Sequence, residues 1–391
     1  MIVIKRKFKQ NYKTGFPILL EEAVLGKVSA TEGDIVKLVD DADTYLCTAY
    51  IGHQNKGIGW MLSLDPEEKI NYNYFYEKIE KSIAARQKFY NSKKTNAFRV
   101  FNGEGDGIGG MTIDYFDGYY LFNWYNKGIY TFKDKILSAF MNVTEFKGIY
   151  EKKRFNDGGK VVESESYVCG EEAPTPLVIM ENNNYYALDF NDGGMVGLFL
   201  DQRDVRNCIQ KKYSKGKRVL NTFSYTGGFS IAAAIGGANK TVSVDVAKRS
   251  LEWTEENLYL NDLSLMSNEI IITDVFEYFD TAYENDELFD VIVLDPPSHS
   301  KTKKKIFSVE KHYQELIEKS IKLLKKDGII VASTNHSGLS RDKFMEQIDA
   351  GFKAEKSKYK VVEEFRLPED FRTNKKFEGS NYLKVIFVQK G

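Results

Sequence analysis

The chain has 391 residues, and its 55 lysines and arginines are balanced by 56 aspartates and glutamates. Hydrophobic residues make up 42% and aromatic residues 14% of the sequence, which is enough to build packed cores and excludes a disordered or fibrous protein. The balanced charge excludes binding of nucleic acid through a bulk basic excess, so such a contact would need local basic patches.

The cysteines and the apolar runs indicate the compartment. Cys47, Cys169 and Cys208 lie far apart and form no CxxC pair, so neither a disulfide framework nor a metal site is predicted. Residues 1–13 lack the apolar run of a signal peptide, and no window reaches the length of a membrane span. We therefore predict a cytoplasmic protein with no membrane partner.

The first half of the chain predicts two small domains. Residues 1–68 read as a small β-barrel, with short strand-like runs between polar turns at 34–39, 46–51 and 57–62. Residues 69–189 read as a middle α+β domain. Its predicted helices are 71–91 and 132–141, and its predicted strands include 98–101, 111–115 and 119–124.

One literal GxGxxG motif occurs in this half, at Gly105, Gly107 and Gly110. A dinucleotide loop follows a strand and opens a helix, so that backbone amides and the helix dipole face the phosphates. Here the glycines lead into the strand-like MTIDYF, and Glu104 and Asp106 would repel an anion. The motif therefore predicts a glycine-rich β-turn.

Residues 190–391 alternate apolar Val- and Ile-rich runs with helical periods such as 248–260 and 310–324, which is typical of an α/β doubly wound parallel sheet. Seven strands are predicted, at 218–223, 241–245, 269–274, 290–295, 328–333, 360–365 and 382–388. Because no crossover helix joins the last two, we expect the last strand to run antiparallel to the others.

The ends of the first three strands predict a cofactor site. The first ends in NTFSYTGG (221–228) before a small-residue helix, the second ends at Asp245 and the third at Asp274. Small residues allow a ligand to approach the backbone, and the acids can accept from ribose hydroxyls and an adenine amino group. Acidic surroundings without a phosphate cradle favour S-adenosylmethionine (SAM), which is cationic. The alternative is that these acids are ordinary turn and N-cap residues.

The fourth strand ends in Asp295-Pro296-Pro297-Ser298-His299. Two prolines fix the backbone and hold a carboxylate at the sheet edge, beside the expected position of a transferred methyl group. The alternative is a rigid strand exit, but after an apolar strand of such a sheet the motif indicates a methyltransferase that acts on a base.

Together, GLFLDQRDVR, NTFSYTGGFS, SVDVAKRSLEWTEENLYLN, DVIVLDPPSHSK and NYLKVIFV resemble bacterial 23S ribosomal RNA methyltransferases of the RlmI type and the C-terminal half of RlmKL. The resemblance covers nearly the whole chain. It implies an N-terminal PUA domain, a middle domain and a seven-stranded Rossmann-like class I methyltransferase domain over 190–391. It also implies SAM as cofactor, with S-adenosylhomocysteine as product, and a homodimer. The implied cofactor-binding residues are Asp201, Gln202, Arg203, Asn221, Phe223, Ser224, Tyr225, Thr226, Gly227, Asp245, Val246, Asp274, Val275 and Asp295.

One departure from the family bears on the reaction. Cytosine-C5 members carry a cysteine after the fifth strand, because C5 needs a thiolate to add to C6. This chain has His336 there, in a segment that resembles the Ser-Asn-Asn of the guanine-N7 enzyme. We therefore predict guanine-N7 methylation, which needs positioning rather than a nucleophile. The predicted catalytic residues are Asp295, Pro296, Asn335, His336 and His299. Asp295 and Asn335 are expected to hold a flipped base by its Watson-Crick edge, and His299 or His336 to stack on it.

Three alternatives remain open. A nicotinamide dehydrogenase would share the sheet but lacks its phosphate loop here. A cytosine-C5 rRNA methyltransferase would need a different nucleophile. A non-enzymatic SAM-binding factor for RNA or ribosome assembly would explain the missing cysteine.

Local lysine clusters predict the RNA contacts. Lys301, Lys303, Lys304 and Lys305 follow the catalytic motif and could neutralise phosphates beside the target base. A second basic patch, in residues 1–16, contains Lys5, Arg6, Lys7, Lys9 and Lys13 and no acid. The predicted partner is 23S rRNA or a large-subunit assembly intermediate.

Overall fold

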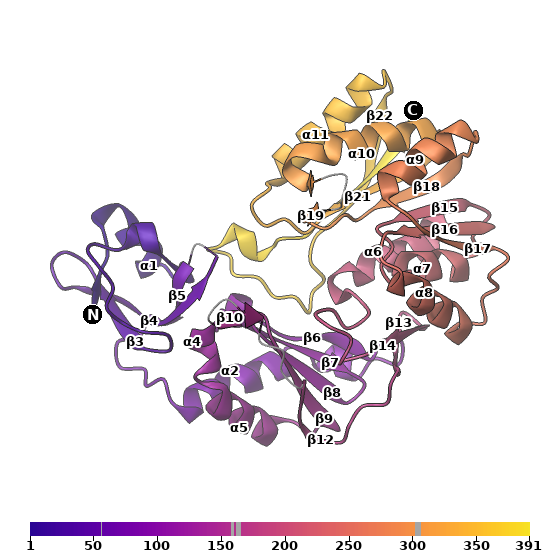
Figure 1. The fold of residues 1–391 in the computed structure, drawn as a ribbon. Helices are drawn as coiled ribbons and strands as arrows, with labels where there is room; N and C mark the ends of the chain where they lie inside the picture. The colour runs from indigo at the N-terminus through magenta and orange to yellow at the C-terminus, as the bar shows by residue number, and fades with distance from the viewer. Residues whose placement is uncertain (56, 158–159, 162–165, 302–305) are drawn as a thin grey trace. The chain divides into compact units, whose positions relative to one another are not determined.

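The computed structural model describes residues 1–55, 57–157, 160–161, 166–301 and 306–391 (Figure 1). The chain divides into two compact units, each assembled from separate stretches of sequence. Unit 1 comprises residues 1–175, 190–196 and 369–380, and unit 2 comprises 176–189, 197–368 and 381–391. The predicted boundaries at 68 and 189 stay a prediction. None of the described helices is both long and apolar enough to cross a membrane.

Unit 1 begins with a five-stranded sheet in the order β1-β3-β4-β5-β2. Its strands are β1 (Ile2–Val3), β2 (Ile18–Leu20), β3 (Ile35–Val39), β4 (Tyr45–Gln54) and β5 (Gly57–Ser63). Three short helical segments accompany it: η1 (Arg6–Phe8), α1 (Lys9–Lys13) and η2 (Glu21–Ala23). Apolar side chains such as Leu38, Cys47 and Ile51 form its core. The strands predicted at 34–39, 46–51 and 57–62 correspond to β3, β4 and β5.

The second sheet of unit 1 has the order β12-β9-β8-β7-β6. Its strands are β6 (Ala97–Asn102), β7 (Met111–Phe116), β8 (Tyr119–Trp124), β9 (Gly148–Lys153) and β12 (Tyr167–Gly170). The accompanying helices are α2 (Tyr72–Ala84), α3 (Gln87–Tyr90), α4 (Lys127–Tyr130) and α5 (Lys133–Val143), and a short ribbon pairs β10 (Asn156–Asp157) with β11 (Lys160–Val161). The helix predicted over 71–91 is interrupted at Arg86. The buried guanidinium of Arg86 donates hydrogen bonds to Asp106 and to the carbonyl of Asp370, which lie far from it in the sequence.

The glycine-rich segment 103–110 lies between β6 and β7, which pair antiparallel, and begins with the short 3-10 turn η3 (Gly103–Gly105). No helix follows it before β7. The prediction that GxGxxG is a turn rather than a phosphate loop is confirmed.

Unit 2 contains a seven-stranded sheet in the order β17-β16-β15-β18-β21-β23-β22. Its strands are β15 (Arg218–Thr222), β16 (Lys240–Asp245), β17 (Asn268–Ile272), β18 (Phe289–Leu294), β21 (Leu324–Thr334), β22 (Tyr359–Phe365) and β23 (Lys384–Lys390). Strand β23 pairs antiparallel with both neighbours, whereas the other pairings are parallel, as predicted.

Helices cover both faces of this sheet, so its strands are apolar on both sides (Figure 1). Val219 and Val293 pack with α6 and α7 on one face, while Leu220 and Ile292 pack with α9, α10 and α11 on the other. The helices are α6 (Arg203–Cys208), α7 (Gly228–Ile235), α8 (Arg249–Leu260), α9 (Val275–Glu284), α10 (Val309–Leu323) and α11 (Arg341–Ala354), with shorter turns η4 (Leu200–Gln202), η5 (Ile209–Tyr213) and, within unit 1, η6 (Glu378–Ser380). Two ribbons complete the fold, β13 (Leu177–Glu181) with β14 (Asn184–Leu188) and β19 (His299–Lys301) with β20 (Ile306–Ser308).

Candidate active site

The loop between β15 and α7 has an unusual backbone. Phe223, Tyr225 and Gly227 all have left-handed conformations, with φ of 54°, 51° and 75°. Such conformations cost about 1–3 kcal/mol at each non-glycine residue, and they persist where the surrounding structure holds them. Ser224 is held in this way, because its N–H donates to the carbonyl of Val244 on the neighbouring strand at 3.0 Å. The loop is therefore fixed at the carboxyl edge of the sheet.

Asp245, at the end of β16, ties this loop to the next one. Its carboxylate oxygens accept from the N–H groups of Tyr225 and Ala247, each at 2.9 Å. Each oxygen keeps a second lone pair, so the carboxylate can still accept from a ligand. The adjacent Val246 is 59% exposed, which leaves an apolar side chain open beside this carboxylate.

Two buried polar atoms of the loop have no hydrogen-bond partner among the described residues, namely Oδ1 of Asn221 and Oγ of Ser224. Asn221 Nδ2 donates to Ser230 at 3.0 Å, which fixes the amide. The Thr226 hydroxyl donates to the carbonyl of Gly197 at 2.6 Å. Because buried polar atoms are normally paired, the two orphaned atoms fit a ligand that brings its own donors, such as an ammonium group.

Asp274 follows β17 and caps α9. Its Oδ1 accepts from the N–H of Phe276 at 2.9 Å, as expected for an N-cap residue. The next residue, Val275, is buried. The predicted contact of this pair with adenine stays a prediction.

Asp295 follows β18 and is partly buried, and Pro296 after it is buried. The buried amide of Gln202 donates from Nε2 to Asp295 Oδ2 at 3.1 Å and to Ser333 Oγ at 2.8 Å. Burial raises the pKa of the Asp295 carboxyl from 3.8 to about 6, and the nearby Asp201 carboxylate acts in the same direction, whereas hydrogen bonds from Ser333 and Gln202 oppose the shift. The structure thus joins η4, β18 and β21 around one carboxylate.

The segment before α6 contributes the other residues of the predicted DQR motif. Asp201 accepts from the hydroxyl of Tyr382 at 2.9 Å, which ties η4 to the start of β23. Arg203 is buried in the first turn of α6, and its carbonyl accepts from Asn182 at 3.3 Å. These contacts position Gln202 against Asp295.

Asn335 and the two histidines lie at the same edge. Ser298 Oγ donates to Asn335 Oδ1 at 2.8 Å, so the two strand ends are joined and the amide is oriented. The rings of His299 and His336 lie 5.8 Å apart between centroids. His336 Nε2 is 3.7 Å from the carboxylate of Glu310, and its Nδ1 is buried with no partner among the described residues.

Sequence reasoning missed two supporting residues. The hydroxyl of buried Tyr313 lies 3.0 Å from the carbonyls of both Leu294 and Ser333, directly before Asp295 and Thr334. Buried Lys384 donates to the carbonyl of His336 at 2.9 Å. Lys384 lies within the NYLKVIFV segment, but nothing in that segment predicts its contact with His336. The only sequence signal for Tyr313 was a tyrosine within the apolar stripe of a predicted helix.

Cys208, the one cysteine of unit 2, lies in α6. It packs in the apolar core with Val219 and Phe229. Burial raises its thiol pKa to about 11, so a thiolate is scarce at neutral pH. Cys208 therefore has the properties of a structural thiol.

The predicted RNA-binding lysines are only partly described. Lys303, Lys304 and Lys305 lie outside the described residues, and Lys301 is described as the last residue of β19. In unit 1, Lys5 donates to the carbonyl of Glu22 at 2.9 Å. Arg6 and Lys7 are exposed in η1, where the Lys7 ammonium lies 4.7 Å from the centre of the Phe8 ring. Among the described residues, no group of three His, Cys, Asp or Glu side chains is arranged to hold a metal ion.

The family described as S-adenosylmethionine-dependent methyltransferase has a model that matches residues 160–385, which is more than half of the chain. The chain belongs to this family. Its cofactor is therefore SAM, and the loop 221–228, Asp245 and the two orphaned polar atoms fit that ligand. A PUA-like domain model matches residues 2–64.

Two curated relatives match most of the chain. YwbD of Bacillus subtilis, which carries the provisional name of a ribosomal RNA large subunit methyltransferase, is 48% identical and covers 100% of this chain and 99% of its own. The ribosomal RNA large subunit methyltransferase I of Escherichia coli is 29% identical over 91% of this chain and 90% of its own. The crystal structure of SMU.776 complexed with SAH has a TM-score of 0.93, with 39% identity and 99% of both chains covered.

Proposed function

We propose that this methyltransferase transfers the methyl group of SAM to N7 of a guanosine in 23S rRNA, either free or in a large-subunit assembly intermediate. The names of the two curated relatives support ribosomal RNA of the large subunit as the substrate. A PUA-like domain at residues 2–64 is consistent with an RNA partner. A homodimer stays a prediction of the resemblance alone.

The observation that supports the methylated atom is the lack of a usable thiol at the site. Asn335 and His336 follow β21 where cytosine-C5 enzymes carry their nucleophile, and Cys208 is buried with a raised pKa. Covalent addition to cytosine C6 requires a thiolate. Guanine N7 has an exposed lone pair, so it needs only alignment with the methyl donor.

The polar groups of the site complement guanine. Gln202 donates to Oδ2 of Asp295 and thereby orients that carboxylate, which can accept from N1–H and the 2-amino group of the base. Ser298 donates to Oδ1 of Asn335, which leaves the Asn335 amide hydrogens to donate to O6. Cytosine presents an amino donor and ring acceptors in another order, so the same pair would fit it poorly.

The residues of this chain therefore bind and orient the base rather than remove a proton. Bound at the strand ends, SAM supplies an electrophilic methyl group on a positively charged sulfur. Tyr313 and Lys384 fix the backbone of the strand ends that carry Asp295, Asn335 and His336. His299 and His336 are proposed to stack on the flipped base.

The test is to incubate purified protein with unmodified 23S rRNA and SAM that carries a deuterated methyl group, and then to identify labelled nucleosides by mass spectrometry. We expect labelled 7-methylguanosine, and its loss with Asp295→Asn. Labelled 5-methylcytidine in its place would refute the proposal, and no labelled nucleoside on any rRNA substrate would favour the non-enzymatic alternative.

A further inference from the structure

Residues 369–380 form an excursion of the chain that we call the strap. They connect β22 to β23, both strands of unit 2, yet they belong to unit 1. The strap begins after Pro368 and returns at Asn381, shortly before Tyr382 and Lys384 of the candidate site. Its position in unit 1 is therefore held by contacts rather than by continuity with the sheet.

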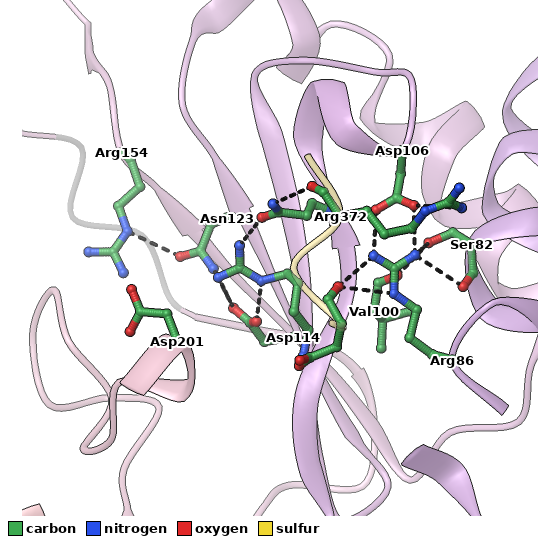
Figure 2. A network of polar contacts seen from close by, with 12 residues as sticks. Ser82, Arg86, Val100, Asp106, Asp114, Asn123, Arg154, Asp201 and Arg372 are labelled. Carbon is green, nitrogen blue, oxygen red and sulfur yellow. Dashed lines mark hydrogen bonds and ion pairs between the residues drawn. The ribbon is translucent and has the colours of Figure 1, made fainter. Parts of the chain in front are cut away.

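The first part of the strap is anchored by a buried arginine (Figure 2). Arg86 forms a bidentate ion pair with Asp106 at 2.6 and 2.7 Å, and both side chains are 1% exposed. The same guanidinium donates twice to the carbonyl of Asp370, at 2.6 and 3.1 Å. Asn102 donates to the carbonyl of Arg372 at 2.8 Å. Buried, charge-assisted hydrogen bonds are strong and directional, so these contacts hold the strap backbone in a single position.

The GxGxxG segment explains how the strap approaches so closely. A Cβ on Gly105 would lie 1.9 Å from the carbonyl oxygen of Arg372, which is closer than any real contact. Asn374 Nδ2 also donates to the carbonyl of Glu104, at 3.4 Å. The GxGxxG segment therefore provides the surface on which the strap packs.

The second part of the strap is a turn closed by its own hydrogen bonds. The N–H of Asn374 donates to Ser380 Oγ at 2.9 Å, and the N–H of Lys376 donates to Asn374 Oδ1 at 2.8 Å. Lys375 and Lys376 are exposed on this turn, and neither has an ion-pair partner within the part of the chain that the structure describes. Their backbone is fixed although their side chains face solvent.

The turn adjoins the basic start of the chain. Phe377 contacts Phe16 edge to face, with 5.9 Å between ring centroids, and Phe16 follows the exposed Lys13 at the end of α1. The exposed acids of the strap are Glu369, which pairs with Lys88, and Glu378. Lys375 and Lys376 together form what we call the strap surface.

We propose that the strap surface binds the phosphates of an RNA strand, an inference that rests on the proposed RNA substrate. Lysines on a fixed backbone lose less conformational entropy on binding than lysines on a mobile loop. In sequence, the strap continues directly into Tyr382 and Lys384, which contact Asp201 and the carbonyl of His336. The surface lies outside the clusters predicted from the sequence.

The test is the double variant Lys375→Ala, Lys376→Ala, measured for affinity to a 23S rRNA fragment over a series of salt concentrations. We expect roughly tenfold weaker binding near 0.1 M salt and a salt slope reduced by about 1 to 2, because each phosphate contact contributes about 0.7–0.9 to that slope. The SAM affinity and the melting temperature should not change. The charge-preserving variant Lys375→Arg, Lys376→Arg should bind RNA as the wild type does.

The matched control is Lys211→Ala, Lys215→Ala, which removes two exposed lysines of unit 2 that also lack an ion-pair partner in the described residues. It should bind RNA nearly as the wild type does. If the strap variant keeps wild-type affinity and slope while the wild type still forms 7-methylguanosine, the strap surface is refuted and the proposed function stands. If the wild type itself neither binds nor methylates rRNA, the proposed function fails and this inference fails with it.

Discussion

Two glycine-containing loops of this protein, 103–110 in unit 1 and 221–228 in unit 2, differ in how well their glycine spacing predicts their structural setting. The first has the literal spacing of a nucleotide-binding motif, yet its glycines admit neighbouring protein segments such as the strap. The second lacks that spacing, yet it lies at the carboxyl edge of a parallel sheet between a strand and a helix. The flanking elements, rather than the glycine spacing, therefore determine whether a loop lies at the carboxyl edge of a parallel sheet, which is where ligands bind in folds of this kind.

The physical reason is the direction of the flanking strands. Strands β6 and β7 are antiparallel, so their connection closes a hairpin and offers no helix N-terminus to a ligand. Strands β15, β16 and β18 are parallel, so their ends bring Asn221, Asp245 and Asp295 to one edge. Four predictions test this difference, beginning with the largest expected effect.

The variant Asp295→Asn should lower kcat/KM for RNA by about 100-fold or more, since the amide replaces one acceptor of the base with a donor. It should leave the protein folded, because removing a partly buried charge relieves its desolvation. Methyl transfer and thermal unfolding of the purified variant measure both effects. Asp342→Asn, at an exposed carboxylate of the same unit, is the control and should keep full activity.

The variant Gly105→Ala should destabilise unit 1 by about 1–3 kcal/mol, because its methyl group overlaps the carbonyl of Arg372. Its SAM affinity should equal that of the wild type. Gly194→Ala is the control, since a Cβ there would meet only the guanidinium end of Arg154. A loss of SAM binding without loss of stability would mean that the loop 103–110 binds the cofactor after all.

The variant Gly227→Ala, unlike Gly105→Ala, should weaken SAM binding. Its φ of 75° costs an alanine about 1–2 kcal/mol, and its Cβ would lie 2.6 Å from Thr254. We expect the loop to shift and the SAM dissociation constant to rise about tenfold, the equivalent of 1.4 kcal/mol. Calorimetric titration with SAM measures this change. Unchanged affinity would remove the loop 221–228 from the proposed cofactor site.

The smallest effect should be the pH dependence of the wild type. Because the pKa of Asp295 is raised to about 6, and only the ionised carboxylate accepts from both donors of the base, log kcat/KM should decline below pH 6 and approach one unit per pH unit. The raised pKa also means that ionisation of Asp295 costs stability above pH 6, and this cost disappears as the pH falls toward 3.8. A kinetic limb near pH 4 would show that Asp295 is not the group involved.

The sequence allowed the strands of unit 2 and the antiparallel last strand to be predicted, because apolar runs of this length and missing crossover helices are local signals. It did not allow the break in the helix over 71–91 to be predicted. That break depends on Arg86, which is drawn inward by Asp106 and by a strap more than 280 residues later in the chain. The periodic pattern carries no trace of such a contact.

The same limit applies to the candidate site. The positions of Asn221, Asp245 and Asp295 could be predicted, because each lies at or directly after the carboxyl end of a strand of a recognisable sheet. Tyr313 could not, because its place between the carbonyls of Leu294 and Ser333 depends on how α10 packs across two strands. Residues that support a site only through tertiary packing form no recognisable motif in the sequence.

The central claim is that this site methylates guanine N7 without a cysteine nucleophile. The most direct measurement compares the wild type and Cys208→Ser, each incubated with 23S rRNA and deuterated SAM, by mass spectrometry of the nucleosides formed. We predict labelled 7-methylguanosine from both proteins at similar rates. Labelled 5-methylcytidine from the wild type, lost in Cys208→Ser, would contradict the account.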